Sequence, residues 1–228
     1  MGCDIHMYAE TRKDINSPWE KVGRIFPNEY YDPKVVNTID DDGYQWNAEF
    51  TDQPYTGRNY DLFAILANVR NGRGFAGIKT GEGFNFISHP KGLPVNVSSE
   101  IKDISDGWDC DGHSHSWFTV QELKGFDWGQ LTMQRGVITL SEYQSLKASD
   151  KSEPNSWCGS ISGPNIVVID EDEVEDYLQK PSTKDIHVNY HWGSMYNESC
   201  DFFLKNTLPT LESLGDTENV RIVFFFDN

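Results

Sequence analysis

The sequence predicts an α+β fold in which several helices pack on a mixed, largely antiparallel central sheet with long irregular loops. Strand-like and helix-like patterns follow one another without strict βαβ alternation. Residues 220–226 form a near-continuous apolar run, typical of a strand in the centre of a sheet, whereas residues 27–56 show no regular period. Because no low-complexity linker interrupts the 228 residues, we expect one globular domain spanning residues 1–228.

Charge limits the partners that the chain can bind. Its 36 acidic and 19 basic side chains give a formal net charge of -17, which repels nucleic-acid backbones. We therefore expect no sequence-independent DNA binding, and a small anionic ligand would need a local positive patch. No apolar run is long enough to span a membrane, and the first residues lack the features of a secretory signal, so the sequence predicts a cytoplasmic protein. The four cysteines are too widely spaced to indicate a disulfide framework.

Residues 3–11 alternate between apolar and polar side chains and predict the first strand. Asp4 and His6 lie on the same side of this strand. A carboxylate and an imidazole placed in this way suit half of a metal site or an acid–base pair, and equally a hydrogen-bonded pair in a polar layer. Residues 19–26 predict a second strand, with turn residues before it.

The apolar residues of the segment 58–70 recur at the spacing of a core-facing helix, which Asn71 and Gly72 end. Arg70 and Arg73 then stand beside several glycines. In an acidic chain these two arginines could supply the positive patch that an anionic ligand requires. The glycines match no established phosphate-binding loop motif, so this signal is weak on its own.

The segment 109–117 holds the densest group of possible ligands, with two carboxylates, a thiol and two imidazoles. If its backbone is extended, His113 and His115 leave the same face of the strand. Together with Asp111 they could then reach one metal ion or one phosphate. The alternative is a polar surface loop in which the histidines only form hydrogen bonds to their neighbours.

Further helix and strand signals follow along the chain. Residues 95–106 are polar with little apolar content. Thr119 and Glu122 have the spacing of a capping box, which predicts a helix from about Val120. The remaining expected elements are a short hairpin at 131–139, a helix at 141–146, an exposed loop at 147–156, a strand at 165–169, a helix capped by Asp170 that ends near Gln179, and a helix at 198–214 divided near Pro209.

Residues 185–192 predict a strand with two distinct faces. Apolar side chains occupy one face, and His187, Asn189 and His191 occupy the other. If this polar face points inward, the three side chains line a pocket. If it points outward, they form the solvated side that antiparallel sheets commonly have.

Three sequence blocks carry a resemblance: MGCDIH at residues 1–6, RNYDLF at 58–63 and DGHSHSW at 111–117. Together they resemble a group of small uncharacterised proteins found in bacteriophage genomes. The resemblance implies an accessory protein that acts in the cytoplasm of the host cell, and it transfers no catalytic residue. Because such accessory proteins commonly counter host defence, it also implies a ligand among nucleotide immune signals.

The leading functional hypothesis is a divalent-metal-dependent hydrolase that acts on a phosphate ester or nucleotide. A Zn, Mn or Mg ion would activate a water molecule and neutralise charge on the phosphate. Its ligands would be Asp4, His6, Asp111, His113 and His115. His187 or His191 would serve as general acid or substrate clamp. A metal-free variant would use His113 and His115 directly as the acid–base pair.

Two alternatives belong to a different class. The first is a binding protein that sequesters a nucleotide signal by stacking on its base and holding its phosphates. The side chains suited to such a ligand are Arg58, Arg70, Arg73, Trp46, Trp117, Asn189, Tyr190 and Trp192. The second is an inhibitor that binds a basic host protein through its acidic surface.

Overall fold

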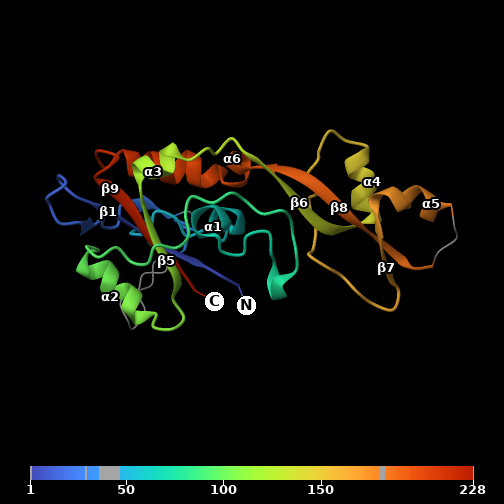
Figure 1. Cartoon of the computed structure of the whole chain (residues 1–228), viewed down its shortest axis with the longest axis horizontal. Helices are drawn as coiled ribbons and strands as arrows, with labels where there is room; N and C mark the ends of the chain where they lie inside the picture. The colour runs from blue at the N-terminus through green and yellow to red at the C-terminus, as the bar shows by residue number, and fades with distance from the viewer. Residues whose placement is uncertain (1, 29, 36–46, 180–182, 228) are drawn as a thin grey trace. The chain divides into compact units, whose positions relative to one another are not determined.

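The structure is a computed structural model that describes residues 2–28, 30–35, 47–179 and 183–227, so Trp46 lies outside the described residues. It confirms the predicted α+β fold, in which helices pack on mainly antiparallel sheets (Figure 1). The chain divides into two compact units. Unit 1 comprises residues 1–59, 87–127 and 201–228, and unit 2 comprises residues 60–86 and 128–200. The single domain expected from the sequence stays a prediction.

Unit 1 is built on a four-stranded antiparallel sheet in the order β2-β1-β9-β5. Its strands are β1 (Ile5–Thr11), β2 (Glu20–Lys21), β5 (His113–Thr119) and β9 (Val220–Phe226). Every residue of β9 is buried between β1 and β5, which confirms the predicted central strand. The strand predicted at 19–26 was wrong in extent, because only β2 and the start of β3 (Phe26–Pro27) are extended there. β3 pairs with β4 (Phe50–Thr51) in a separate ribbon.

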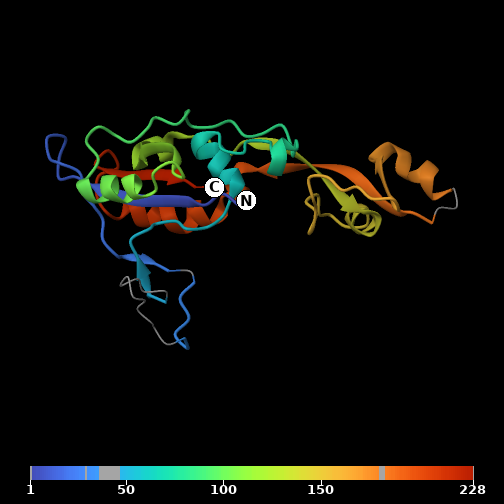
Figure 2. The same cartoon turned by 90° about the horizontal axis from the view of Figure 1, so that it is seen from below.

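Helices cover both faces of this sheet. Helix α2 (Ser99–Gly107) packs through Ile101 on the face that carries Tyr8, Val223 and Phe225. Helices α3 (Val120–Gly125) and α7 (Leu208–Glu212) contact β9. Figure 1 shows α2 below the strands and α3 above them, and in Figure 2 β1 (blue) and β9 (red) run side by side. The sequence did not predict α2, because its segment offers few apolar residues and depends on packing against the sheet.

Unit 2 contains a mixed three-stranded sheet in the order β6-β8-β7. Strand β8 (Asp185–Met195) pairs antiparallel with β6 (Leu131–Thr139) and parallel with β7 (Ile166–Asp170). Since β6 is one continuous strand, the predicted hairpin at 131–139 was wrong. The helical elements of unit 2 are α1 (Tyr60–Ala67), α4 (Leu140–Lys147), α5 (Val174–Leu178), α6 (Tyr196–Ser199) and the 3₁₀ turns η1 (Phe75–Gly77) and η2 (Glu171–Glu173).

Local signals explain where two helices begin. The Thr119 hydroxyl accepts a hydrogen bond from Glu122 N at 3.1 Å, and the Glu122 carboxylate accepts one from Thr119 N at 2.7 Å, which confirms the predicted capping box. The helix predicted at 198–214 is interrupted by a π-helical turn, η3 (Phe203–Thr207), directly before α7. Pro209 has no N–H to continue the α-helical pattern, which accounts for the interruption.

A buried ion pair joins β1 to β9. Arg221 Nε donates to Glu10 Oε2 at 2.6 Å, and the two side chains are only 2% and 0% exposed. Ser98 N donates to the other Glu10 oxygen at 2.6 Å, and the remaining Arg221 nitrogens donate to Asn96. The Arg221 guanidinium also lies 4.0 Å from the centre of the Trp19 ring. These contacts satisfy both charges and fix the register in which Glu10 faces Arg221.

Replacing Arg221→Met should lower the free energy of unfolding by about 3–5 kcal/mol, because the Glu10 carboxylate would remain buried without its partner. The double variant Glu10→Gln with Arg221→Met should recover part of this loss, since it removes the unpaired charge. Urea unfolding midpoints measure both effects. Lys124→Met, which breaks the exposed Lys124–Glu212 pair, is the matched control and should leave the midpoint near that of the wild type. If Arg221→Met and Lys124→Met shifted the urea midpoint equally, the stabilising role assigned to the buried Glu10–Arg221 pair would be contradicted.

Candidate functional site

Polar side chains gather at one end of the unit 1 sheet. Because β1 and β9 are antiparallel, the start of β1 lies beside the end of β9. Asp4 N donates to Asp227 Oδ1 at 3.0 Å, and His6 Nε2 lies 3.3 Å from Asp227 Oδ2. With Arg58 and the two histidines at the start of β5, these residues form what we call the sheet-end cluster. Its members are Asp4, His6, Arg58, His113, His115 and Asp227.

Arg58 binds the Asp4 carboxylate at the part of the cluster that is exposed to solvent. Its Nε donates to Oδ1 at 2.7 Å and its Nη2 to Oδ2 at 2.5 Å, the forked geometry in which guanidinium groups bind carboxylates and phosphates. These hydrogen bonds hold the pKa of Asp4 below its ordinary range. Both side chains remain about half exposed, at 52% and 45%. Asp4 is therefore an ionised carboxylate whose partner is a cation accessible to solvent.

The start of β5 does not follow simple alternation. Ser114 has a φ of 53°, and the pairing register with β9 shifts between His113 and Ser116. As a result His115 stacks on Phe225, with ring centres 5.0 Å apart, whereas His113 stacks on Phe226 at 6.0 Å. Consecutive residues of a strand point to opposite faces. The prediction that His113 and His115 share one face was therefore wrong, because a bulge intervenes.

His113 retains an unsatisfied nitrogen. Its Nδ1 lies 3.0 Å from Ser114 Oγ, but its Nε2 is buried and has no hydrogen-bond partner within the described part of the chain. Buried polar atoms without partners are rare in folded proteins and often mark functional positions.

His6 and His115 flank Phe225 on the face of the sheet that α2 covers. Each imidazole stacks on the Phe225 ring at 5.0 Å between centres and 22° between planes. Because they belong to β1 and β5, on either side of β9, the two rings are separated by two strand spacings, or about 10 Å. Trp108 packs against His6 with ring centres 4.2 Å apart. Phe225 is thus flanked by one imidazole on either side, and its own ring is fully buried.

Beside His115 the surface forms a hollow of about 500 Å³. Its lining residues are Gly92, Leu93, Ser105, Asp106, Asp109 and His115. Ser105 Oγ lies 2.9 Å from His115 Nε2. Burial, together with the nearby His113, lowers the pKa of His115 below its usual value, so its imidazole is neutral at pH 7. Asp109 adopts a φ of 45°, a strained conformation that is frequent at functional sites.

The predicted metal ligands do not surround one point. Within residues 2–28, 30–35, 47–179 and 183–227, no three His, Cys, Asp or Glu side chains are placed to share a metal ion. Asp4 is held by Arg58, Asp111 is exposed, and His6 lies about 10 Å from His115. The role of a divalent ion stays a prediction.

The predicted residues of the 185–192 strand belong to unit 2, so the sheet-end cluster is described without them. They share one face of the unbroken strand β8, as predicted, but they differ in exposure. His187 is buried at 6% exposure, with its Nδ1 unpartnered among the described residues, whereas His191 is exposed beside Glu171. Asn189 donates to Asp170 at 2.7 Å.

Four further predicted ligand-binding residues also lie in unit 2. Trp192 is only 3% exposed and belongs to a hydrophobic cluster that also contains Tyr190, so its ring is a core side chain and cannot stack on a base. The Arg70 guanidinium lies over the Tyr60 ring at 4.9 Å, and Arg73 is exposed. In unit 1, Trp117 already has a cation on its ring, since Lys91 Nζ lies 3.9 Å from the ring centre.

Sequence reasoning missed three residues of the site. Asp227 follows directly after the buried strand β9, and a polar residue at the end of a buried strand is a signal that could have identified it. Ser105 and Trp108 lie in or just after α2. Ile101, Ile104 and Trp108 recur at helical spacing, and this signal could have placed Ser105 and Trp108 on the face of α2 that packs on the sheet.

No protein-family model, curated protein or solved structure matches this chain. Function is therefore inferred from the geometry of the site. Within the residues that the structure describes, no helix is both long enough and apolar enough to cross a membrane.

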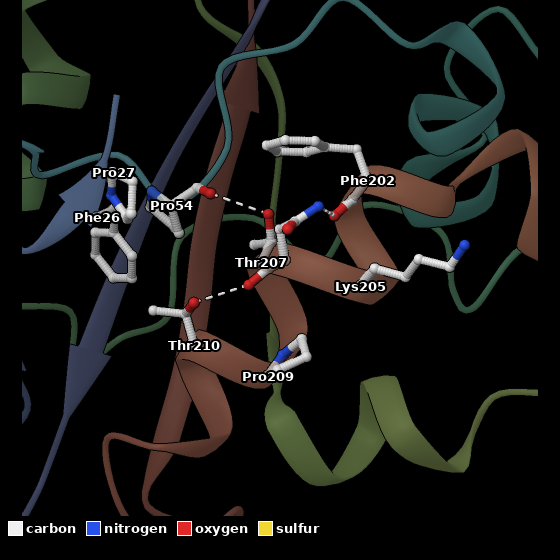
Figure 3. Close-up of a pocket in the computed structure, with 9 residues that line it drawn as sticks. Phe26, Pro27, Pro54, Phe202, Lys205, Thr207, Pro209 and Thr210 are labelled. Carbon is white, nitrogen blue, oxygen red and sulfur yellow. Dashed lines mark hydrogen bonds between the residues drawn. The ribbon is translucent and has the colours of Figure 1, made fainter. Parts of the chain in front are cut away.

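A second hollow in unit 1, of about 380 Å³, has a different character (Figure 3). It lies between Pro54 and the π-helical turn η3, where the Thr207 hydroxyl donates to Pro54 O at 3.0 Å. Phe26 and Phe202 contribute aromatic rings to its wall. Of the described residues that line it, only Lys205 is ionisable. The first hollow contains the imidazole and the hydroxyl, so it is the better candidate for catalysis.

The pKa of His115 has a consequence for stability. In the folded state it lies below the unfolded value of 6.5, so the unfolded chain binds more protons as the pH falls through this range. The stability that the neutral imidazole contributes is present above pH 6.5 and is lost as the pH falls toward the folded-state pKa. We expect the wild type to lose more of its Tm than His115→Gln when the pH falls from about 7.5 to about 5. His89→Gln, at an exposed position, is the control and should keep the full pH dependence. If Tm fell with pH in the same way for the wild type and His115→Gln, the lowered pKa assigned to His115 would be contradicted.

Proposed function

We propose that the protein is a hydrolase of a phosphate ester or nucleotide, in which His115 and His6 act as base and acid. The observation that carries the proposal is the placement of these two imidazoles on either side of Phe225 on one face of the sheet. A base and an acid on opposite sides of the reacting group can assist an in-line displacement at phosphorus.

The surroundings of the two histidines suit different roles. His115 borders the hollow and is neutral at pH 7, because burial lowers its pKa, so it can accept a proton. His6 Nε2 lies within hydrogen-bonding distance of the Asp227 carboxylate. That contact orients the ring, as a carboxylate does for the histidine of a catalytic triad. Nδ1 of His6 is then the nitrogen that donates the proton.

The spacing of the rings suits displacement at phosphorus. In an in-line displacement the attacking and leaving oxygens lie on opposite sides of the phosphorus. With one hydrogen bond at each end, such an arrangement spans about 10 Å. This matches the separation of about 10 Å between the two imidazoles across Phe225. Because the Phe225 ring is fully buried, the phosphate would reach the two imidazoles at their solvent-accessible edges and not over the ring.

Arg58 offers the local positive charge that a chain with a net charge of -17 needs in order to hold a phosphate. Its forked contact with Asp4 has the geometry with which guanidinium groups also hold phosphates, and the group is half exposed. Substrate phosphate would compete with the Asp4 carboxylate for it. If the chain is the phage accessory protein that the sequence resembles, the substrate would be a nucleotide immune signal.

Turnover of bis(4-nitrophenyl) phosphate and of a panel of linear and cyclic dinucleotides tests the proposal. His115→Ala and His6→Ala should each lower kcat by about 10²–10⁴-fold, because each removes a proton-transfer group. His89→Ala, an exposed histidine of the same unit, should leave kcat unchanged.

The other hypotheses give different results in the same assay. Loss of turnover with EDTA, restored by Zn, Mn or Mg, would select the metal-dependent hydrolase. Recovery of an intact dinucleotide from the heat-denatured complex, without turnover, would select the binding protein. Full activity in both histidine variants would refute the acid–base assignment.

A further inference from the structure

We propose that Ser105 is the nucleophile of this hydrolase and forms a covalent phosphoryl-serine intermediate, with phosphodiesters as the substrate class. The inference rests on the proposed function and adds a reaction step to it. Its basis is that Ser105 and His115 line the same hollow with their Oγ and Nε2 atoms 2.9 Å apart. A hydroxyl within hydrogen-bonding distance of an imidazole is the arrangement that activates a serine for attack.

The fold holds this pair in position. Ser105 lies in the last turn of α2, which is anchored on the sheet by the fully buried Ile101. His115 is fixed from the other side by its stack on Phe225 in the central strand. Ser105 is only 6% exposed, so its hydroxyl has little contact with bulk water although it lines the hollow. The nucleophile and its base thus come from a helix and a strand that pack directly on one another.

The reaction balances with the groups present. In the first step Ser105 Oγ attacks the phosphorus, its proton passes to His115 Nε2, and the bond to the leaving oxygen breaks as that oxygen takes a proton from His6. In the second step water attacks the phosphoryl-serine. His6, now neutral, takes the proton of that water, and His115 returns its proton to the departing Ser105 oxygen. Both histidines regain their starting states, and the net change is hydrolysis of one ester bond.

The rim of the hollow favours substrates of low charge. The Asp106 and Asp109 carboxylates border the same space as Ser105. Asp106 is paired with Lys102, so the Asp109 carboxylate is the group that repels each negative charge on a substrate, and a phosphomonoester dianion is disfavoured relative to a singly charged phosphodiester. The same hollow thus contains the proposed nucleophile and the charge that selects its substrate.

Acid-quench experiments with bis(4-nitrophenyl) phosphate test the inference. The wild type should release a burst of 4-nitrophenolate equal to the enzyme concentration, if breakdown of the intermediate limits turnover. Under that condition the quenched protein should carry one 4-nitrophenyl phosphoryl group on the peptide that contains Ser105. Ser105→Ala should lose the adduct and lower kcat by about a hundredfold or more. Ser99→Ala, an exposed serine at the start of the same helix, is the matched control and should behave like the wild type.

Ser105→Cys separates a nucleophile from a positioning residue. If Ser105 attacks the phosphorus, this variant should form an adduct on the sulfur of the introduced thiol, and that adduct should turn over more slowly. Urea midpoints show whether each variant is folded. No adduct in the wild type, together with retained turnover in Ser105→Ala and loss in His115→Ala, would overturn the nucleophile while leaving the acid–base proposal intact. Retained turnover in both Ser105→Ala and His115→Ala would refute the nucleophile and the acid–base proposal together. Absence of turnover in the wild type would do the same.

Discussion

The central position of β9 is the constraint on which the site in unit 1 depends. β9 lies between β1 and β5, so Phe225 is flanked by His6 on one side and His115 on the other. A shift of one residue in the pairing of β1 with β9 would move His6 to the opposite face. The buried pair of Glu10 and Arg221, four residues from His6 and Phe225 along their strands, prevents that shift. A structural ion pair therefore sets the geometry of the face that carries His6 and His115.

Those parts of the fold that depend on local chemistry could be predicted from the sequence. The apolar run of β9 indicated a central strand, and the Thr119 capping box marked the start of α3 to the residue. Helix α2 was missed although Ile101, Ile104 and Trp108 recur at helical spacing, because the rest of its segment is polar and offers few apolar residues. Trp192 was misjudged for a related reason. The sequence pattern of a strand with alternating apolar and polar residues is the same whether its aromatic side chains contact a ligand or pack in the core.

The site was predicted in part. Asp4, His6, His113 and His115 do belong to one end of one sheet, as their dense grouping suggested. Their arrangement could not be read from spacing, because the bulge at Ser114 separates His113 from His115 and Arg58 holds Asp4. Ser105 and Asp227 enter the site only through tertiary pairing. This arrangement motivates the proposal that the two histidines on either side of Phe225 act as an acid and a base.

The proposed mechanism depends most on His115 being a neutral base at the pH at which the enzyme works. The most direct measurement is the pH dependence of kcat/KM for a phosphodiester substrate, which reports the ionisations of the free enzyme. Because burial lowers the pKa of His115, the acid limb should have a midpoint below the ordinary histidine value of about 6.5 and should disappear in His115→Ala. An acid limb at or above that value, or one that persists in His115→Ala, would contradict the proposed mechanism.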